Sequence, residues 1–366
     1  MIDTDFWRER RVFLSGHTGF KGGWTALLLH SLGARVFGFA LPPEGEPNLF
    51  AAAGIERDLH HCIGDLRDFS AVSSAIAEAR PDIVIHMGAQ SLVRRSYLDP
   101  VSTYATNVMG TVHLLEAVRH APSVRAVVVV TSDKCYENRN VPRGYQETDP
   151  LGGHDPYSNS KGCAELVTDA YRRSFYSTPS SASVATARAG NVIGGGDWAE
   201  DRLIPDAMRA FMAEEPLLIR NPLAIRPWQH VLDPVLAYLL LAERLFARPG
   251  AFAQAWNFGP SADSEVSVET VVNRVVRLWG AGAGWQNDGG EHPHEAACLK
   301  LDCTKAATQL GWRPLLSLDD ALRLTVEWYR AFQDGGDMRA VTLGQIGRIL
   351  GTGGLRGVQT RGLAMS

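Results

Sequence analysis

The chain has 366 residues, of which 45% are hydrophobic and 21% are charged, and its formal net charge is -4. These values are typical of a globular protein with one large core or two lobes, and they exclude a disordered chain. The weakly negative charge gives no general attraction to phosphate backbones or anionic membranes, so neither nucleic acid nor membrane is an expected partner.

The first residues, MIDTDFWRER, are acidic where a signal peptide is basic, and no apolar segment follows them. The most apolar later stretch, at 235–246, is too short and too charged to span a bilayer. Five cysteines form no CxxC pair, and their odd number favours reduced thiols. We therefore expect a cytoplasmic protein.

Short apolar runs alternate with helical patterns through the first half of the chain. The apolar runs, which lack the clean alternation of half-exposed strands, cover 10–16, 34–40, 82–89, 125–132 and 183–194. The helical patterns cover 22–33, 68–79, 108–121 and 158–175. This order predicts an α/β fold with a doubly wound, Rossmann-like parallel sheet.

The composition changes after residue 195, where loops rich in glycine, proline and tryptophan begin. The elements predicted in this part are a strand at 254–260 and helices at 266–280 and 318–333. The expected domains are a sheet domain at 1–195 that is rejoined by about 225–260, a mainly substrate-binding mixed α/β lobe at 196–350, and a glycine-rich tail at 351–366.

The sequence GHTGFKG places Gly16, Gly19 and Gly22 between the first predicted strand and the first predicted helix. Glycines at such a turn let the backbone approach a pyrophosphate at the positive end of a helix. With a βαβ unit around it, the motif predicts dinucleotide binding. The alternative is a glycine-rich turn of purely structural use.

Asp65 and Leu66 stand where the third strand is predicted to end, in position to meet an adenine ring. No acid ends the second strand, because Glu44 and Glu46 follow two prolines. No arginine is placed there to hold a 2'-phosphate either. The end of this strand therefore leaves NAD and NADP undecided.

The strand predicted at 125–132 ends in Ser132, Asp133 and Lys134, and the next helix begins with Tyr157 and Lys161, four residues apart. Four residues place both side chains on one helix face. A serine, a phenol and an ammonium beside a nicotinamide can oxidise an alcohol. The adjacent acid and amine are either an acid and base for a second step or an ordinary ion pair at a strand end.

These motifs resemble those of the extended short-chain dehydrogenase/reductases, and among them the nucleotide-sugar 4,6-dehydratases, over nearly the whole chain. The triplet Ser132-Asp133-Lys134 is similar to that of the CDP-glucose group of this family. The resemblance implies NAD as cofactor and a CDP-glucose substrate that is oxidised at C4, loses water across C5 and C6 and receives the hydride at C6. It also implies a homodimer or higher homo-oligomer with helices 108–121 and 158–175 at the interface, and a role in deoxysugar and O-antigen biosynthesis.

The resemblance also implies roles for individual residues. For the cofactor it implies Thr18, Phe20 and Lys21 at the phosphates, and Ala89, Thr106, Tyr157 and Lys161 at the ribose and nicotinamide. For the sugar and its diphosphate it implies Gln90, Ser91, Asn107, Asn191, Arg202 and Arg226. The planar guanidinium groups of the two arginines are suited to phosphate oxygens.

Two other functions stay open at this point: a nucleotide-sugar 4-epimerase, and a non-catalytic NAD-binding regulatory protein of the same fold. The sequence EHPHE offers His292, His294 and Glu295, but it is interrupted by proline and has no further ligand at metal-binding spacing. No metal is therefore expected.

Overall fold

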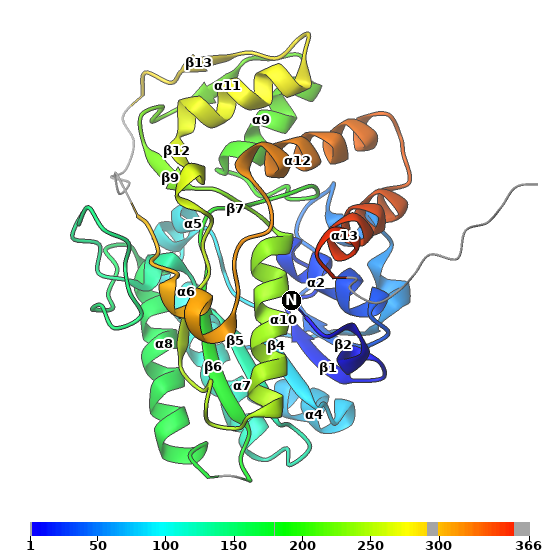
Figure 1. Ribbon diagram of the computed structural model, residues 1–366, viewed down its shortest axis with the longest axis vertical. Coiled ribbons are helices and arrows are strands. Elements are labelled where there is room, and N and C mark those ends of the chain that lie inside the picture. The colour runs from blue at the N-terminus through cyan, green and yellow to red at the C-terminus, as the bar shows by residue number, and fades with distance from the viewer. Residues whose placement is uncertain (1, 179, 291–298, 355–366) are drawn as a thin grey trace, which may run out of the picture.

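The computed structural model describes residues 2–178, 180–290 and 299–354. A seven-stranded parallel sheet forms its centre, with the strand order β11-β6-β5-β4-β1-β2-β3 (Figure 1). The strands are β1 Arg11–Ser15, β2 Arg35–Ala40, β3 His60–Ile63, β4 Ile83–His86, β5 Ala126–Val130, β6 Ser183–Arg188 and β11 Ala255–Asn257. The predicted doubly wound parallel sheet is confirmed.

Strand β5 shows why the apolar runs lack alternation. Val128 and Val130 belong to one hydrophobic core, and Val127 and Val129 belong to the core on the opposite face of the sheet. Each side chain is therefore buried whichever way it points, and a β-branched residue suits both faces.

Helices cover both faces of the sheet. The helices of one face are α2 Phe20–Ser31, α10 Leu232–Ala247 and α13 Met338–Gly354. The helices of the other face are α4 Phe69–Ala79, α7 Gly110–Arg119 and α8 Pro156–Phe175. Helix α10 contains the apolar stretch at 235–246 and lies within the larger core, and in the described part of the chain no helix is long and apolar enough to cross a membrane.

A smaller mixed lobe lies beyond the carboxyl ends of the strands, at the top of Figure 1. Its helices are α9 Leu203–Met212, α11 Val268–Trp279 and α12 Leu318–Gln333. Its strands form three two-stranded pairs: β7 Val192–Ile193 with β10 Gln229–His230, β9 Ile225–Pro227 with β12 Glu265–Ser267, and β8 Leu217–Ile219 with β13 Trp285–Asn287.

Short helices complete the described chain. The α-helices are α1 Thr4–Trp7, α3 Leu49–Ala52, α5 Val93–Leu98 and α6 Pro100–Tyr104. The others are the 3-10 helices η1 Ile55–Asp58, η3 Asp133–Cys135 and η4 Ala262–Ser264 and the π-helices η2 Ala105–Met109 and η5 Ala306–Leu310. Segment η2 runs directly into α7, so the helix predicted at 108–121 has a π-helical start.

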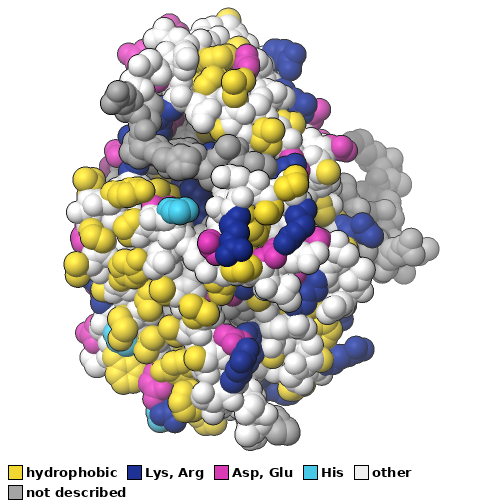
Figure 2. Space-filling view, turned by 90° about the vertical axis from the view of Figure 1, so that its left-hand side faces the viewer, with side chains coloured by type: hydrophobic (Ala, Val, Ile, Leu, Met, Phe, Trp, Pro, Cys, Tyr) yellow, Lys and Arg dark blue, Asp and Glu magenta, His cyan; other side chains and the backbone are white. Residues whose placement is uncertain are grey.

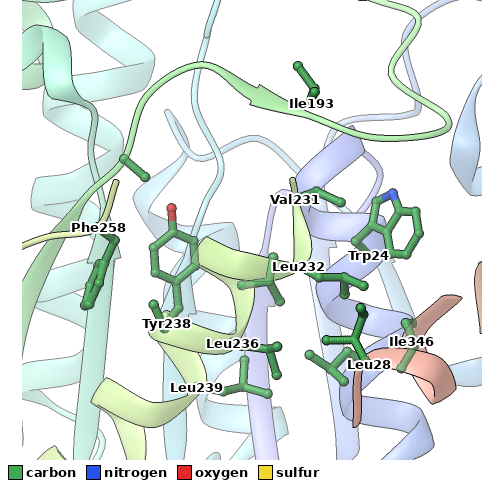
Figure 3. Packing of buried hydrophobic residues seen from close by; sticks show 14 of the residues in the cluster. Trp24, Leu28, Ile193, Val231, Leu232, Leu236, Tyr238, Leu239, Phe258 and Ile346 are labelled. Carbon is green, nitrogen blue, oxygen red and sulfur yellow. The ribbon is translucent and has the colours of Figure 1, made fainter. Parts of the chain in front are cut away.

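The last described helix, α13, packs against α2 of the sheet domain as well as against α12. Figure 3 shows Leu28 of α2 beside Ile346 of α13, and both side chains are buried in the same core. The Arg339 guanidinium also forms a two-pronged ion pair with Asp58. Helix α13 therefore packs on the sheet domain as well as on the smaller lobe.

Two predictions concern residues that the structure does not describe. The sequence EHPHE and residues 355–366 of the glycine-rich tail lie outside the described residues, while 351–354 end α13. Within the described ranges no group of three or more histidine, cysteine or acidic side chains could hold a metal ion.

Candidate active site

The loop between β1 and α2 carries the predicted glycine motif. Gly16 has φ +79°, a Cβ there would lie 2.8 Å from the Gly88 nitrogen, and a Cβ on Gly22 would lie 2.0 Å from the Gly16 oxygen. The backbone itself therefore requires these two glycines. A Cβ on Gly19 would lie 3.5 Å from the nearest atom, so glycine there suits a ligand that approaches the backbone. Gly19 is also the N-cap of α2 without a side-chain cap, which leaves first-turn amides for an anion.

Three predicted cofactor side chains follow in the same loop. Thr18 Oγ1 donates a 2.9 Å hydrogen bond to the carbonyl just after β2, and Phe20 begins α2. Burial and the Arg202 cation lower the pKa of Lys21 to about 8, while the Asp133 carboxylate acts in the opposite direction. The Lys21 ammonium therefore interacts with the strand end that carries Asp133, which its predicted role at the phosphates did not include.

The residues predicted at the adenine and ribose follow β3 and β4 or lie in η2. The Asp65 carboxylate accepts from the Arg67 backbone nitrogen at 2.9 Å and from its Nη2 at 2.6 Å, and these hydrogen bonds lower the pKa of Asp65. Leu66 is buried against the backbone that follows β4. Ala89 lies in the loop after β4, and Thr106 lies in the π-helix η2.

An arginine that is distant in the sequence lies near the end of β2. Arg95 comes from α5 and forms an ion pair with Glu44, in the loop after β2. The carboxylate offsets the guanidinium, so the pair offers no uncompensated positive charge to a 2'-phosphate.

At the end of β5, Ser132 caps the 3-10 helix η3. Its hydroxyl donates to Asp133 Oδ1 at 2.9 Å and accepts from the Lys134 backbone nitrogen at 3.2 Å. Asp133 is only 2% exposed, and a Cβ added to Gly190 would lie 1.9 Å from its Oδ2. Among the described residues no ion pair joins the Lys134 ammonium to the Asp133 carboxylate, so the structure does not show the ordinary salt-bridged strand end.

Tyr157 and Lys161 lie on the first turns of α8, which Asp155 caps. Burial raises the pKa of Tyr157, and a hydrogen bond with Ser132 offsets part of this rise. The net pKa is about 12. Burial lowers the pKa of Lys161 to about 8, and its Nζ donates to the Val130 carbonyl at 3.3 Å. The structure thus joins Tyr157 to Asp133 through Ser132, while Lys161 reaches the end of β5 instead of the phenol.

Glu165, one turn further along α8, was not predicted. Its carboxylate is buried and binds Arg188 Nη2 and Thr186 Oγ1, each at 2.7 Å, and the Thr131 hydroxyl. This network ties α8 to the ends of β5 and β6, and the Glu165 charge raises the pKa of Lys161. The four-residue spacing from Lys161 was the one signal of it in the sequence.

Asn107 and Gln90, both predicted to bind the sugar, form hydrogen bonds within the protein. Asn107 is 2% exposed, accepts from the Gln90 nitrogen at 2.8 Å, and donates to the Gln90 oxygen at 2.9 Å and to Ser160 Oγ at 2.8 Å. Gln90 Nε2 donates to Thr103 Oγ1 at 3.0 Å. Asn107 therefore holds the loop after β4 against α8. Its three hydrogen bonds would be lost if its side chain turned to a sugar.

The remaining predicted substrate residues lie in the segments around the smaller lobe. Arg202 pairs with Asp197 at 2.9 Å and donates to Ser91 Oγ at 3.1 Å, and Asp197 is the main cause that raises the pKa of Arg202. Arg226 is in β9 and donates to the neighbouring carbonyl of its own strand. Asn191 adopts φ +44° just before β7. The structure therefore brings Arg202 and Ser91 together.

Comparison with known proteins identifies the family. A model of the GDP-mannose 4,6 dehydratase family matches residues 13–325. A CDP-glucose 4,6-dehydratase of Salmonella typhimurium is 52% identical over 342 residues, which cover 92% of this chain and 95% of that protein. A dTDP-glucose 4,6-dehydratase of Xanthomonas campestris is 29% identical and covers 86% of this chain and 92% of its own.

Solved structures share the fold at lower identity. A UDP-glucose 4-epimerase of Thermotoga maritima with UDP-glucose matches with a TM-score of 0.77 and 22% identity, covering 88% of this chain and 99% of that chain. A dTDP-glucose 4,6-dehydratase of Bacillus anthracis in complex with NAD matches with a TM-score of 0.73 and 22% identity, covering 89% and 98%. On the family match and the close relative, the chain belongs to the GDP-mannose 4,6-dehydratase family.

Proposed function

We propose that this protein is an NAD-dependent CDP-glucose 4,6-dehydratase that converts CDP-D-glucose to CDP-4-dehydro-6-deoxy-D-glucose. One observation carries the proposal: a buried acid and an amine, Asp133 and Lys134, lie at a strand end without pairing to each other, and Ser132 links the acid to Tyr157. The relative that is 52% identical is a CDP-glucose 4,6-dehydratase, which supports the choice of substrate.

The residues around the glycine loop fit a dinucleotide. The first-turn amides of α2 have no side-chain cap and the backbone at Gly19 is accessible, which suits a pyrophosphate. A solved structure of a similar protein with NAD has the same fold. When bound, NAD supplies a positively charged acceptor for the C4 hydride and returns that hydride to C6. Thr18, Phe20 and Lys21 would hold the phosphates, with Asp65 and Leu66 at the adenine and Ala89 and Thr106 at the ribose.

The oxidation at C4 needs a group that takes the proton of the C4 hydroxyl. We assign this role to Tyr157, because its hydrogen bond with Ser132 lowers the pKa of the phenol. The Arg202 charge also favours the phenolate. Lys161, fixed on the Val130 carbonyl, would orient the ribose side of the site.

The elimination needs two further proton transfers. A ketone at C4 makes the C5 proton acidic, so a base that takes this proton and an acid that protonates the C6 hydroxyl release water. The protonated base would then return the proton to C5 when the hydride is added at C6. We assign the base to Lys134 and the acid to Asp133, whose carboxylate is held by Ser132 and by close packing on Gly190. Among the described residues no ion pair joins these two side chains.

For the substrate diphosphate and sugar we propose Arg202 and Arg226, with Ser91, Gln90 and Asn191 nearby. The Arg202 guanidinium already pairs with Asp197, so a phosphate would share or replace that carboxylate. Residues 1–195 with the returning elements α10 and β11 would bind the cofactor, and residues 196–350 would mainly bind the sugar nucleotide.

We also propose a cytoplasmic homodimer that works in deoxysugar and O-antigen biosynthesis. Large apolar side chains are exposed along helices α5 to α8: Tyr97 53%, Leu98 86%, Val101 78%, Met109 46% and Leu166 60%. Figure 2 shows hydrophobic side chains spread over the face on which these helices lie. Such a patch suits a second copy. Light scattering should give a dimer, and a monomer mass would count against it.

The test of the activity is incubation with CDP-, dTDP-, UDP- and GDP-glucose in the presence of NAD, with the products analysed by mass spectrometry. Loss of water from CDP-glucose, much faster than from the others, is the expected result. An isomer of unchanged mass would show a 4-epimerase, and bound NAD without turnover of any substrate would show a regulatory protein.

A further inference from the structure

Tyr238 of α10 carries a buried hydroxyl that has no role in the mechanism above. The residue is 0% exposed, and its hydroxyl has no hydrogen-bond partner among the described residues. Figure 3 shows this hydroxyl pointing out from α10, with the Phe258 ring on one side. A buried hydroxyl without a partner is costly, so a role for it is expected.

A second buried polar atom without a partner lies on the neighbouring strand β10. Gln229 Nε2 donates to the Gly190 carbonyl at 3.0 Å and to the Phe258 carbonyl at 3.1 Å, and this fixes which end of the amide is the oxygen. Gln229 Oε1 is left without a donor among the described residues. The Phe258 ring lies 6.1 Å from the Tyr238 ring between centroids, so Tyr238 and Gln229 share Phe258 as a neighbour.

Gly190 connects these residues to Asp133, the proposed acid. Gly190, whose carbonyl holds Gln229, packs so closely on Asp133 that an added Cβ would lie 2.1 Å from the carboxylate carbon. Tyr238 in turn interacts electrostatically with both Asp133 and Tyr157. Gly190 thus links Gln229 to the Asp133 carboxylate, and Tyr238 interacts with the same carboxylate.

We propose that Tyr238 and Gln229 hold one buried water molecule that hydrogen-bonds the Asp133 carboxylate, which makes Tyr238 a positioning residue for the acid of the dehydration. A water can accept from the Tyr238 hydroxyl and donate to Gln229 Oε1 and to Asp133, which gives it three partners. Both unpartnered atoms are then satisfied. The inference rests on the proposed function, because it concerns the step in which Asp133 protonates the C6 hydroxyl.

The test compares Tyr238→Phe with the unmodified protein, with NAD and CDP-glucose. Mixing should produce NADH at an unchanged rate, because oxidation does not use Asp133, whereas release of water should slow by about 10-fold, so that NADH accumulates transiently. The matched control is Tyr176→Phe, which removes another buried hydroxyl, one that donates to the Leu115 carbonyl outside the site. It should lower Tm without separating the two steps.

A double variant decides whether Tyr238 acts through Asp133. In the Asp133→Asn background, Tyr238→Phe should not lower the residual rate of water release measured over long incubation, and a high-resolution crystal structure of the unmodified protein should show a water between Tyr238, Gln229 and Asp133. A full additional loss in that background, equal slowing of both steps, or no water at this place would overturn the inference. If the unmodified protein releases no water from any nucleotide-glucose, the proposed function fails instead.

Discussion

The substitution Gly190→Ala tests whether the position of the Asp133 carboxylate limits dehydration. The added Cβ would lie 1.9 Å from Oδ2 and 2.6 Å from Oδ1, whereas real Cβ contacts are essentially never under 3.0 Å. The carboxylate must therefore retreat by about 1.1 Å or the backbone must move. A displacement of about 1 Å in a catalytic group can cost on the order of 100-fold in rate. Gly190 has no positive φ, so the loss would come from the overlap and not from backbone strain.

The assay follows NADH by absorbance after mixing with CDP-glucose and measures product by mass. Oxidation at C4 should keep its rate within a few-fold, and formation of the dehydrated product should fall on the order of 100-fold. Gly344→Ala is the matched control, since a Cβ there would meet nothing within 4 Å. Unchanged dehydration in a folded Gly190→Ala protein would refute the assignment of Asp133 as the acid.

Five further substitutions test other parts of the structure. Tyr157→Phe should reduce kcat by about 100- to 10,000-fold while NAD still binds in a calorimetric titration. Asp133→Asn and Lys134→Met should both form NADH and then stall, and exchange of the C5 hydrogen with deuterated solvent should persist only in the Asp133 variant. Arg226→Ala should raise KM more than it lowers kcat in steady-state assays, because a diphosphate contact acts before and during the reaction. Burial raises the pKa of Asp233 from 3.8 to about 7, so the stability that this group contributes is lost as the pH rises from about 4 through 7. In denaturant titrations over that range, the free energy of unfolding of Asp233→Asn should therefore rise on the order of 4 kcal/mol relative to that of the unmodified protein.

The sheet and most of its covering helices could be predicted because their pattern is local. A fully buried parallel strand reads as an unbroken apolar run, as β5 does, and the glycine loop stands directly between a strand and a helix. Helix α10 was not predicted as an element because it is apolar on most sides, with buried residues along nearly its whole length. Such a stretch has little amphipathic period to reveal it.

The contacts that complete the site come from residues that are distant in the sequence. Gly190 lies against Asp133, and Arg188 reaches Glu165, only after β6 has joined the sheet beside β5. The burial of Asn107 likewise depends on how η2 packs against α8. Residue type and spacing carry no record of such packing, so the sequence could not predict the hydrogen bonds that Asn107 makes within the protein.

The return of α13 to α2 has a consequence for how the chain folds on the ribosome. The residues of β1 to β4 leave the exit tunnel early, but Ile346 can cover Leu28 on the apolar face of α2 only after α13 has also been synthesised. The Arg339–Asp58 ion pair spans 281 positions and can form only then. Long-range contacts of this kind close slowly, and until they close the nascent sheet domain exposes apolar surface that chaperones recognise.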